Sequence, residues 1–265
     1  MNGTRFQHGL ALTPRSHLYC YDHQNKSALR ALIIPARTKR AILPESREIA
    51  WFHRPLFGDL IVTELGDRYV AEYFWDNTPV PAEGPFRPPR LKQPPDTWKP
   101  PGFDAEPYVL LNATSGWRHK SWLPERWAGV LRELHAEFGM RFVLTSASTD
   151  WQIRNCHDIQ KLTGPSVRSL ASGTSLENFL WLCANARMVL TVDGAASHLS
   201  AAFGVRNLTL FGRTNIRNWH HPTATSLALQ APPSRDGIRR LRDLAVPGVL
   251  DASRALWMQD SSSKL

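Results

Sequence analysis

The sequence has few cysteines and no long hydrophobic run. Its 265 residues contain three cysteines, Cys20, Cys156 and Cys183, which lie far apart and in no paired spacing. This spacing argues against a disulfide framework and a cysteine-ligated zinc site, and makes a reducing compartment the default expectation. The longest apolar stretch, residues 179–192, is interrupted by polar residues. It therefore falls short of the roughly 20 apolar residues that a membrane-spanning helix needs.

Targeting and catalytic motifs are also lacking. The first fifteen residues have neither the long apolar segment nor the cleavage site of a signal peptide. No P-loop, GxGxxG, HExxH or GxSxG motif occurs, which argues against Walker-type nucleotide hydrolysis, dinucleotide oxidoreduction and serine hydrolysis. His220-His221 has no carboxylate or cysteine at ligand spacing, so we expect no metal site. These features predict a soluble, cytoplasmic protein.

What the sequence does have is an uneven excess of positive charge. The net charge is +9; residues 1–107 hold 14 Lys and Arg against 12 Asp and Glu, whereas residues 108–265 hold 18 against 11. A basic face suits a nucleotide diphosphate, a phosphorylated lipid, a membrane surface or nucleic acid, and it is equally compatible with a merely solvated surface. Nucleic acid is the weaker alternative, because the cations fall in loops after predicted strands and not in a stripe with interleaved aromatic residues.

Proline divides the chain, and a regular alternation follows it. Ten of the 20 prolines lie within residues 79–107, which we predict to be a linker. Beyond it, apolar runs and helical periodicity predict strands at 108–113, 141–146, 167–170, 187–192 and 207–211, and helices at 124–138, 150–162, 175–186, 196–203 and 246–258. Thr174 and Glu177 predict a capping box. Because the strands are apolar on both faces, we expect an α/β domain with a parallel sheet covered by helices at 108–258.

The first part predicts a smaller α/β unit. Residues 17–21 favour a strand, 26–34 a helix, and 62–75 contain a helical stretch. These elements make about one and a half α/β units, too few for a stable sheet. We therefore interpret residues 1–78 as a partial N-terminal domain, and residues 259–265 as a disordered tail.

The candidate ligand-binding residues follow the predicted strands. In a parallel sheet, ligands bind beyond the carboxyl ends of the strands, near helix N-termini. The loop at residues 112–122 places Thr114, Ser115, Arg118 and Lys120 before a helix, which suits a phosphate or diphosphate. The alternative is that the hydroxyls cap a turn and the cations are solvated.

Two later loops add Asp193, Gly194, Ala195 and His198 after one strand, and Arg213 and Thr214 after the next. A carboxylate at the end of a buried strand needs hydrogen bonds, so we expect Asp193 to accept from amides or a ligand hydroxyl, unless it is only a helix N-cap. Gly194 and Ala195 leave room for a ligand. His198 faces either the cleft or the core. Arg213 and Thr214 are candidates for a phosphate or a sugar.

The order of these loops resembles one family. LNATSGWRHKSWLPERWAGVLREL, RFVLTSAS, TSLENFLWLCANARMVLTVDGAASHLSAAFGV and LTLFGRTN together resemble the C-terminal half of glycosyltransferase family 9, the heptosyltransferases of lipopolysaccharide core assembly. The family has the GT-B architecture, in which two Rossmann-like domains face a cleft and the C-terminal domain binds the nucleotide sugar. The resemblance therefore implies a GT-B-like fold.

By position, the resemblance places Thr114, Ser115 and Lys120 around the donor diphosphate. It matches Asp193 and His198 to the family's Asp-Thr/Ser-Gly-x-x-His motif, in which Gly194 and Ala195 here replace the usual Thr and Gly. Asp150 is the nearest match to an acidic residue that contacts the nucleoside ribose in the family. Arg118, Arg213 and Thr214 are secondary donor-binding candidates.

The N-terminal part departs from the family pattern. LYCYDHQNKSALRALI resembles a strand and helix well inside the family's N-terminal domain. The family's opening strand, whose glycine-aspartate loop carries the acceptor-activating carboxylate, has no match, and Gly58-Asp59 resembles that loop only superficially. No catalytic base is therefore assigned.

The resemblance implies inverting transfer of a sugar, with ADP-heptose as the expected donor, to a lipopolysaccharide core or related lipid-linked glycan. It implies no cofactor and no metal, a cytoplasmic location with peripheral contact at the inner membrane, and no nucleic-acid partner. One alternative is a truncated, catalytically impaired protein that binds a nucleotide sugar. The weaker alternative is a basic nucleic-acid-binding protein.

Overall fold

The computed structural model describes residues 17–21, 25–45, 49–78, 84–104, 106–170, 174–221 and 223–259. It divides into two compact units, residues 1–87 and 88–265. Within the described residues, no helix combines the length and the apolar character needed to cross a bilayer. The predicted C-terminal tail, apart from Gln259, and residues 22–24 of the DHQNKSA motif lie outside the described residues.

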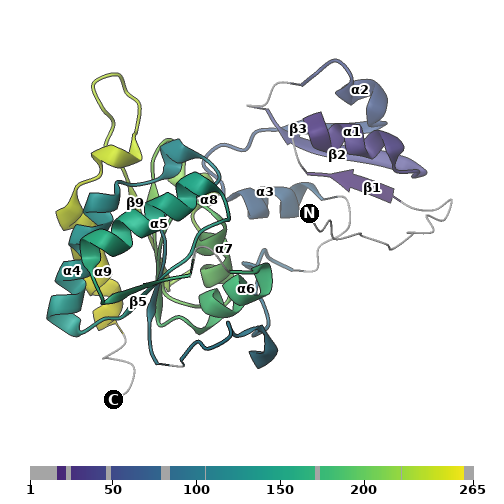
Figure 1. The fold of residues 1–265 in the computed structure, drawn as a ribbon. Helices are drawn as coiled ribbons and strands as arrows, with labels where there is room; N and C mark the ends of the chain where they lie inside the picture. Colours follow the sequence, from purple (N-terminus) through teal and green to yellow (C-terminus); the bar gives the residue numbers. More distant parts are fainter. Residues whose placement is uncertain are drawn as a thin grey trace. The chain divides into compact units, whose positions relative to one another are not determined.

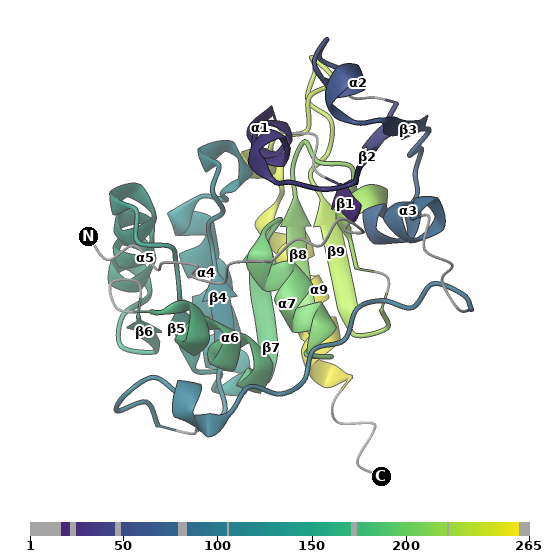
Figure 2. The ribbon, with the colours of Figure 1, turned by 90° about the vertical axis from the view of Figure 1, so that its right-hand side faces the viewer.

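The second unit is built on a six-stranded parallel sheet, as the sequence predicted. Its strands are β4 Val109–Asn112, β5 Phe142–Leu144, β6 Val167–Ser169, β7 Met188–Val192, β8 Asn207–Phe211 and β9 Ser226–Gln230. Their order is β6-β5-β4-β7-β8-β9, which Figure 2 shows from left to right. The strand β9 was not predicted.

Helices cover both faces of this sheet (Figure 1). The long helices are α4 Pro124–Phe138, α5 Asp150–Thr163 and α9 Val246–Met258 on one face, and α6 Leu176–Asn185 and α7 Ala195–Ala202 on the other. The shorter ones are α8 Ile216–Trp219 and the 3-10 turns η1 Asp96–Trp98, η2 Arg118–Lys120 and η3 Leu241–Asp243.

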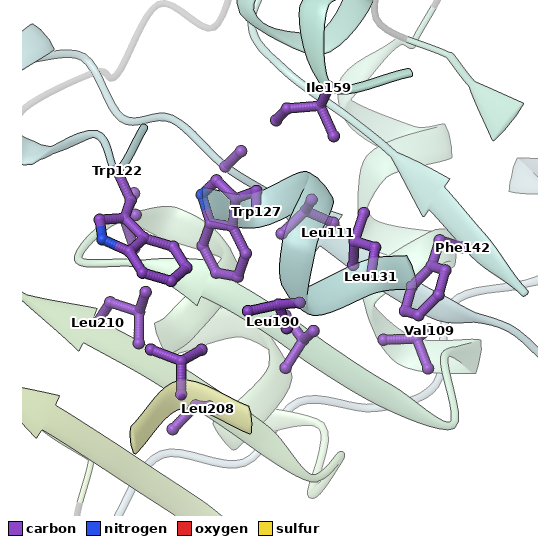
Figure 3. Close-up of a cluster of buried hydrophobic side chains, with 14 of the residues drawn as sticks. Val109, Leu111, Trp122, Trp127, Leu131, Phe142, Ile159, Leu190, Leu208 and Leu210 are labelled. Atoms are coloured by element: carbon purple, nitrogen blue, oxygen red, sulfur yellow. The ribbon is translucent and has the colours of Figure 1, made fainter. Parts of the chain in front are cut away.

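Two apolar clusters follow from the alternation of side chains along each strand. Val109 and Leu111 of β4 pack with α4, α5 and α9, whereas Leu110 packs with α6 and α7. The larger cluster contains Trp122 and Trp127, whose rings meet edge to face with centroids 5.0 Å apart (Figure 3). The sheet is therefore buried on both faces, as strands without a polar face require.

Helix ends follow from local chemistry. The helix α4 has Pro124 in its first turn, and Gly139 ends it with φ of 64°, a left-handed conformation that glycine adopts without strain. The predicted capping box at Thr174 and Glu177 is wrong. Ser175 is the N-cap and accepts from the Asn178 amide, while the Thr174 hydroxyl donates to the Leu170 carbonyl.

The first unit has a three-stranded parallel sheet in the order β1-β2-β3. Its elements are β1 His17–Cys20, α1 Asn25–Ile33, β2 Thr38–Pro44, α2 His53–Leu56, β3 Asp59–Thr63 and α3 Val70–Asn77. The predicted helical stretch at 62–75 is partly wrong, because β3 continues to Thr63 and a turn at Gly66, with φ of 54°, precedes α3. The Thr63 hydroxyl donates to the Tyr73 hydroxyl at 2.9 Å and so ties α3 to β3.

Part of the proline-rich segment packs on the second unit. The Leu91 amide donates to the Ala202 carbonyl at 3.0 Å, and the Asn178 side chain donates to the Trp98 carbonyl at 2.8 Å. These bonds attach the segment to the ends of α6 and α7. Within the segment, the amides of Trp98 and Lys99 donate to the carbonyls of Pro95 and Asp96.

Candidate functional site

The candidate site lies where the strand order reverses. The chain passes from β4 to β5 on one side, whereas β7 is followed by β8 and β9 on the other (Figure 2). The connecting helices α4 and α7 cover opposite faces of the sheet. At such a switch point, the loops after neighbouring strands diverge and leave a crevice that parallel α/β proteins use for ligands.

The loop after β4 is held by a glutamine that the sequence analysis missed. The Gln152 side chain donates to the Thr114 hydroxyl at 3.1 Å and to the Ser115 carbonyl at 3.0 Å. The Thr149 hydroxyl in turn donates to Gln152 Oε1 at 2.6 Å. Because Gln152 and Thr114 are both buried, these bonds fix the loop before any ligand arrives. The sequence signal that could have identified Gln152 is its position as a polar residue in the first turn of α5, the helix that follows the neighbouring strand β5.

An ion pair joins the loops after β4 and β7. Lys120 Nζ lies 2.5 Å from Asp193 Oδ2, and the Asp193 side chain is 7% exposed while that of Lys120 is 26% exposed. The sequence suggested amides or a ligand hydroxyl as partners of Asp193, and the structure gives its carboxylate the lysine instead. A lysine ammonium has three donors, so Lys120 retains donors for a ligand while Asp193 orients it.

His198 lies on α7 within electrostatic reach of this pair. Burial lowers its pKa; the Asp193 carboxylate acts in the opposite direction, and the Lys120 ammonium adds to the lowering. The centroid of its ring lies 6.3 Å from the centroid of the Trp219 ring. His198 is therefore neutral at neutral pH, and the lysine and aspartate provide the fixed charges here.

Between these loops lies a pocket of about 280 Å³, which we call the crevice pocket. It is lined by the loops after four strands, through Asn112, Thr114, Ser115, Gly116, Ser146, Ala147, Gln152, Thr174, Ser175, Leu176, Phe179, Gly194 and Ala195. A Cβ atom at Gly194 would lie 3.4 Å from the Ser115 Cβ, so the loops after β4 and β7 approach closely here. Its lining combines the hydroxyl-bearing residues Thr114, Ser115, Ser146, Thr174 and Ser175 with the apolar side chains of Leu176 and Phe179.

The structure thus brings together most of the predicted residues. Thr114, Ser115, Gly194 and Ala195 line the crevice pocket. The Lys120–Asp193 ion pair joins the loops after β4 and β7, with the neutral His198 within electrostatic reach.

Four predicted residues lie elsewhere. Asp150 is exposed at the start of α5 and does not line the crevice pocket. Arg118 and Arg213 line a different hollow, and the Arg118 guanidinium lies 5.5 Å from the centre of the Trp151 ring. The Thr214 carbonyl accepts from the Gln230 side chain at 2.9 Å. The sequence could not separate these residues from the others, because all of them follow strands.

The comparisons with known proteins agree with this fold. A family model described as glycosyltransferase family 9 (heptosyltransferase) matches residues 21–232. Lipopolysaccharide heptosyltransferase 3 of Escherichia coli is 26% identical over 199 residues, which cover 72% of this chain. The chain spans only 58% of the length of that relative.

Solved structures show the same architecture. The Escherichia coli ADP-heptose lipopolysaccharide heptosyltransferase II matches with a TM-score of 0.72 at 18% identity, over 93% of this chain and 78% of that one. A family 9 glycosyltransferase of Veillonella parvula matches with a TM-score of 0.69 at 14% identity, over 93% and 75%. The fold is therefore GT-B-like. Since the family model covers most of its length, the chain belongs to glycosyltransferase family 9.

Proposed function

We propose that the second unit binds a nucleotide diphosphate sugar at the crevice pocket, with ADP-heptose as the donor. The observation that carries this proposal is the convergence of the Lys120–Asp193 pair with the hydroxyls of Thr114 and Ser115 at the strand switch point. The crevice pocket, about 280 Å³ with one apolar surface, suits a nucleoside. Lys120 and the adjacent hydroxyls then face the diphosphate.

The proposed reaction is inverting transfer to a hydroxyl of a lipopolysaccharide core or related glycan. The acceptor oxygen forms a bond to the anomeric carbon while the bond from that carbon to the diphosphate oxygen breaks, and the diphosphate leaves with the electron pair. A base takes the acceptor proton. Lys120, oriented by Asp193, stabilises the charge that develops on the leaving diphosphate. In this proposal Asp193 is a positioning residue.

The acceptor and location follow from the same proposal. The relative with 26% identity is named a lipopolysaccharide heptosyltransferase, which supports a glycolipid acceptor. The excess of basic residues after residue 107 attracts an anionic surface. We therefore place the working protein at the cytoplasmic face of the inner membrane, in peripheral contact.

Lys120→Ala should weaken ADP binding, measured by calorimetry, by about tenfold or more, because a charge-assisted contact to the diphosphate is lost. Lys161→Ala, at an exposed position on α5, is the matched control and should leave the affinity unchanged. Lys120→Ala leaves the Asp193 carboxylate without its lysine, and that charge could itself repel the diphosphate. The double variant Lys120→Ala with Asp193→Asn removes this second effect. If the double variant binds ADP as the wild type does, the proposed role of Lys120 is wrong.

A donor series tests the nucleotide. The shift in melting temperature with ADP should exceed the shifts with UDP and GDP at equal concentration, because a ligand that binds only the folded state stabilises it more the lower its Kd is. Transfer from ADP-heptose to purified lipopolysaccharide core is then measured separately. Equal shifts with all three nucleotides would contradict the assignment of ADP.

A further inference from the structure

A second hollow lies in the same unit, with a volume of about 450 Å³. The turn η2, the loop after β8 and the segment leading into η3 contribute to it. Its polar lining residues are Arg118, His119, Ser121, Arg213, Arg240 and Arg242. We call it the basic hollow. It shares the loop after β4 with the crevice pocket, whereas the loop after β8 and the segment of η3 do not line that pocket.

The charges in the basic hollow are mostly uncompensated. Among the described residues, no carboxylate lines it. Arg240 is paired with Asp236, but within the described part of the chain Arg118, Arg213 and Arg242 have no carboxylate at ion-pair distance. Arginines gathered around one concavity repel one another, and a bound anion removes that repulsion. The fork geometry of guanidinium groups matches the oxygens of a phosphate.

A hydroxyl and a close backbone contact add to this site. Ser121, which lines the basic hollow, has a buried hydroxyl without a hydrogen-bond partner among the described residues. A Cβ atom at Gly212 would lie 3.2 Å from the Leu241 amide nitrogen. The loop that carries Arg213 is thus packed directly against η3, next to Arg242, and the arginines project from a fixed framework.

The turn η2 links the basic hollow to the proposed donor site. Lys120, its last residue, reaches Asp193, whereas Arg118 and His119 line the basic hollow. The three-residue turn η2 would therefore contact an anion in the basic hollow through Arg118 and His119, and the proposed donor diphosphate through Lys120. A second substrate bound there would lie next to the donor.

We propose that the basic hollow binds a phosphate group carried by the acceptor glycan. This proposal rests on the proposed function, since it needs a donor in the crevice pocket and an acceptor beside it. A phosphate group in the basic hollow could belong either to the acceptor or to the donor nucleotide. Because Arg213, Arg240 and Arg242 lie on the loop after β8 and on the segment of η3, which do not line the crevice pocket, we assign the basic hollow to the acceptor.

The test uses the full chain, the double variant Arg213→Gln with Arg242→Gln, and the control Arg235→Gln, an exposed arginine nearby that does not line the basic hollow. Three binding measurements are made on each protein. Inorganic phosphate is titrated in the presence of saturating ADP and followed by phosphorus NMR line broadening. ADP alone is titrated by calorimetry. Core oligosaccharide is titrated before and after enzymatic removal of its phosphates. Thermal melts verify that each variant is folded.

We expect wild type and control to bind phosphorylated oligosaccharide about tenfold or more tighter than the dephosphorylated form, and to broaden the phosphate signal. The double variant should lose both effects while its ADP affinity stays within about twofold. Equal binding of the two oligosaccharides by the wild type overturns the proposal. A loss of ADP affinity in the double variant comparable to that of Lys120→Ala assigns the hollow to the donor and also overturns it. Failure of the proposed function appears separately, as a wild type that does not bind ADP.

Discussion

Three histidines of the second unit have their pKa values lowered by burial. His198 and His220 are partly buried, and His221 is 2% exposed. For His221, burial is the largest cause, and together with the electrostatic effects of His198, His220 and Arg90 it lowers the pKa from 6.5 to about 4. At neutral pH the three rings are therefore neutral, and the positive charge of the candidate site comes from lysine and arginine.

The lowered pKa of His221 makes stability depend on pH. Below pH 6.5 the His221 ring is protonated in the unfolded chain, whereas in the folded chain it stays neutral until about pH 4. Stability therefore falls as the pH drops from 6.5 to 4. At pH 4.5 this effect lowers the free energy of unfolding of the wild type by an amount on the order of 2 kcal/mol, and His221→Asn should remove that loss. The melting temperature of this variant should fall less between pH 6.5 and 4.5 than that of the wild type. His157→Asn, at an exposed position, is the control; equal slopes for wild type and His221→Asn would contradict the prediction.

At the scale of elements, close backbone packing fixes the segment after β9. Gly212→Ala places a Cβ atom 3.2 Å from the Leu241 amide nitrogen and 3.5 Å from the Arg239 carbonyl, where only backbone can move aside. We expect a loss of about 1–3 kcal/mol in the free energy of unfolding, measured with denaturant. Gly248→Ala on α9 is the control, since its Cβ meets nothing within 4 Å. It should be neutral or stabilising by up to about 1 kcal/mol. Equal effects of the two substitutions would show that the contact does not constrain the segment.

The same scale shows which elements the sequence could predict. The strands and helices from β4 to β8 follow from apolar runs that alternate with helical periodicity, and α4 begins and ends where Pro124 and Gly139 predict. The missed strand β9 has one buried residue followed by four half-buried ones, so its apolar pattern is weaker than that of the fully buried strands β7 and β8. The choice of Ser175 over Thr174 as N-cap depends on backbone geometry that sequence spacing does not specify.

The candidate site was predictable only in part, because local sequence indicates which residues follow a strand but not which of them meet in the folded chain. Loop residues such as Thr114 and Asp193 follow buried strands, and a parallel sheet brings such positions to one edge. The distance between Lys120 and Asp193 and the role of Gln152 depend on tertiary packing between segments far apart in sequence. Nothing in the local pattern separates Arg213, which lines the basic hollow, from the residues of the crevice pocket.

At the scale of the whole molecule, each unit has its own apolar cluster. Ala31, Ala41 and Phe57 are the buried members of the cluster in the first unit, whereas two larger clusters cover both faces of the sheet in the second. The residues of the proposed donor site all belong to the second unit.

We therefore expect residues 88–265, expressed alone, to fold and to bind ADP within about twofold of the affinity of the full chain. Calorimetry on the fragment and on the full chain makes this comparison, with the fragment carrying Lys120→Ala as a negative control. A folded fragment that does not bind ADP would mean that the first unit contributes to the donor site.

The reversal of strand order between β4 and β7 has a consequence for divergence within the family. The crevice exists because the helices after these strands leave toward opposite faces, so its position depends on the path of the chain and not on any one side chain. Residues around it can be replaced while the crevice stays at the same edge of the sheet. Chains only 18% and 14% identical to this one share its fold. New donor or acceptor preferences can therefore evolve through the loops alone, without a change in the sheet that carries them.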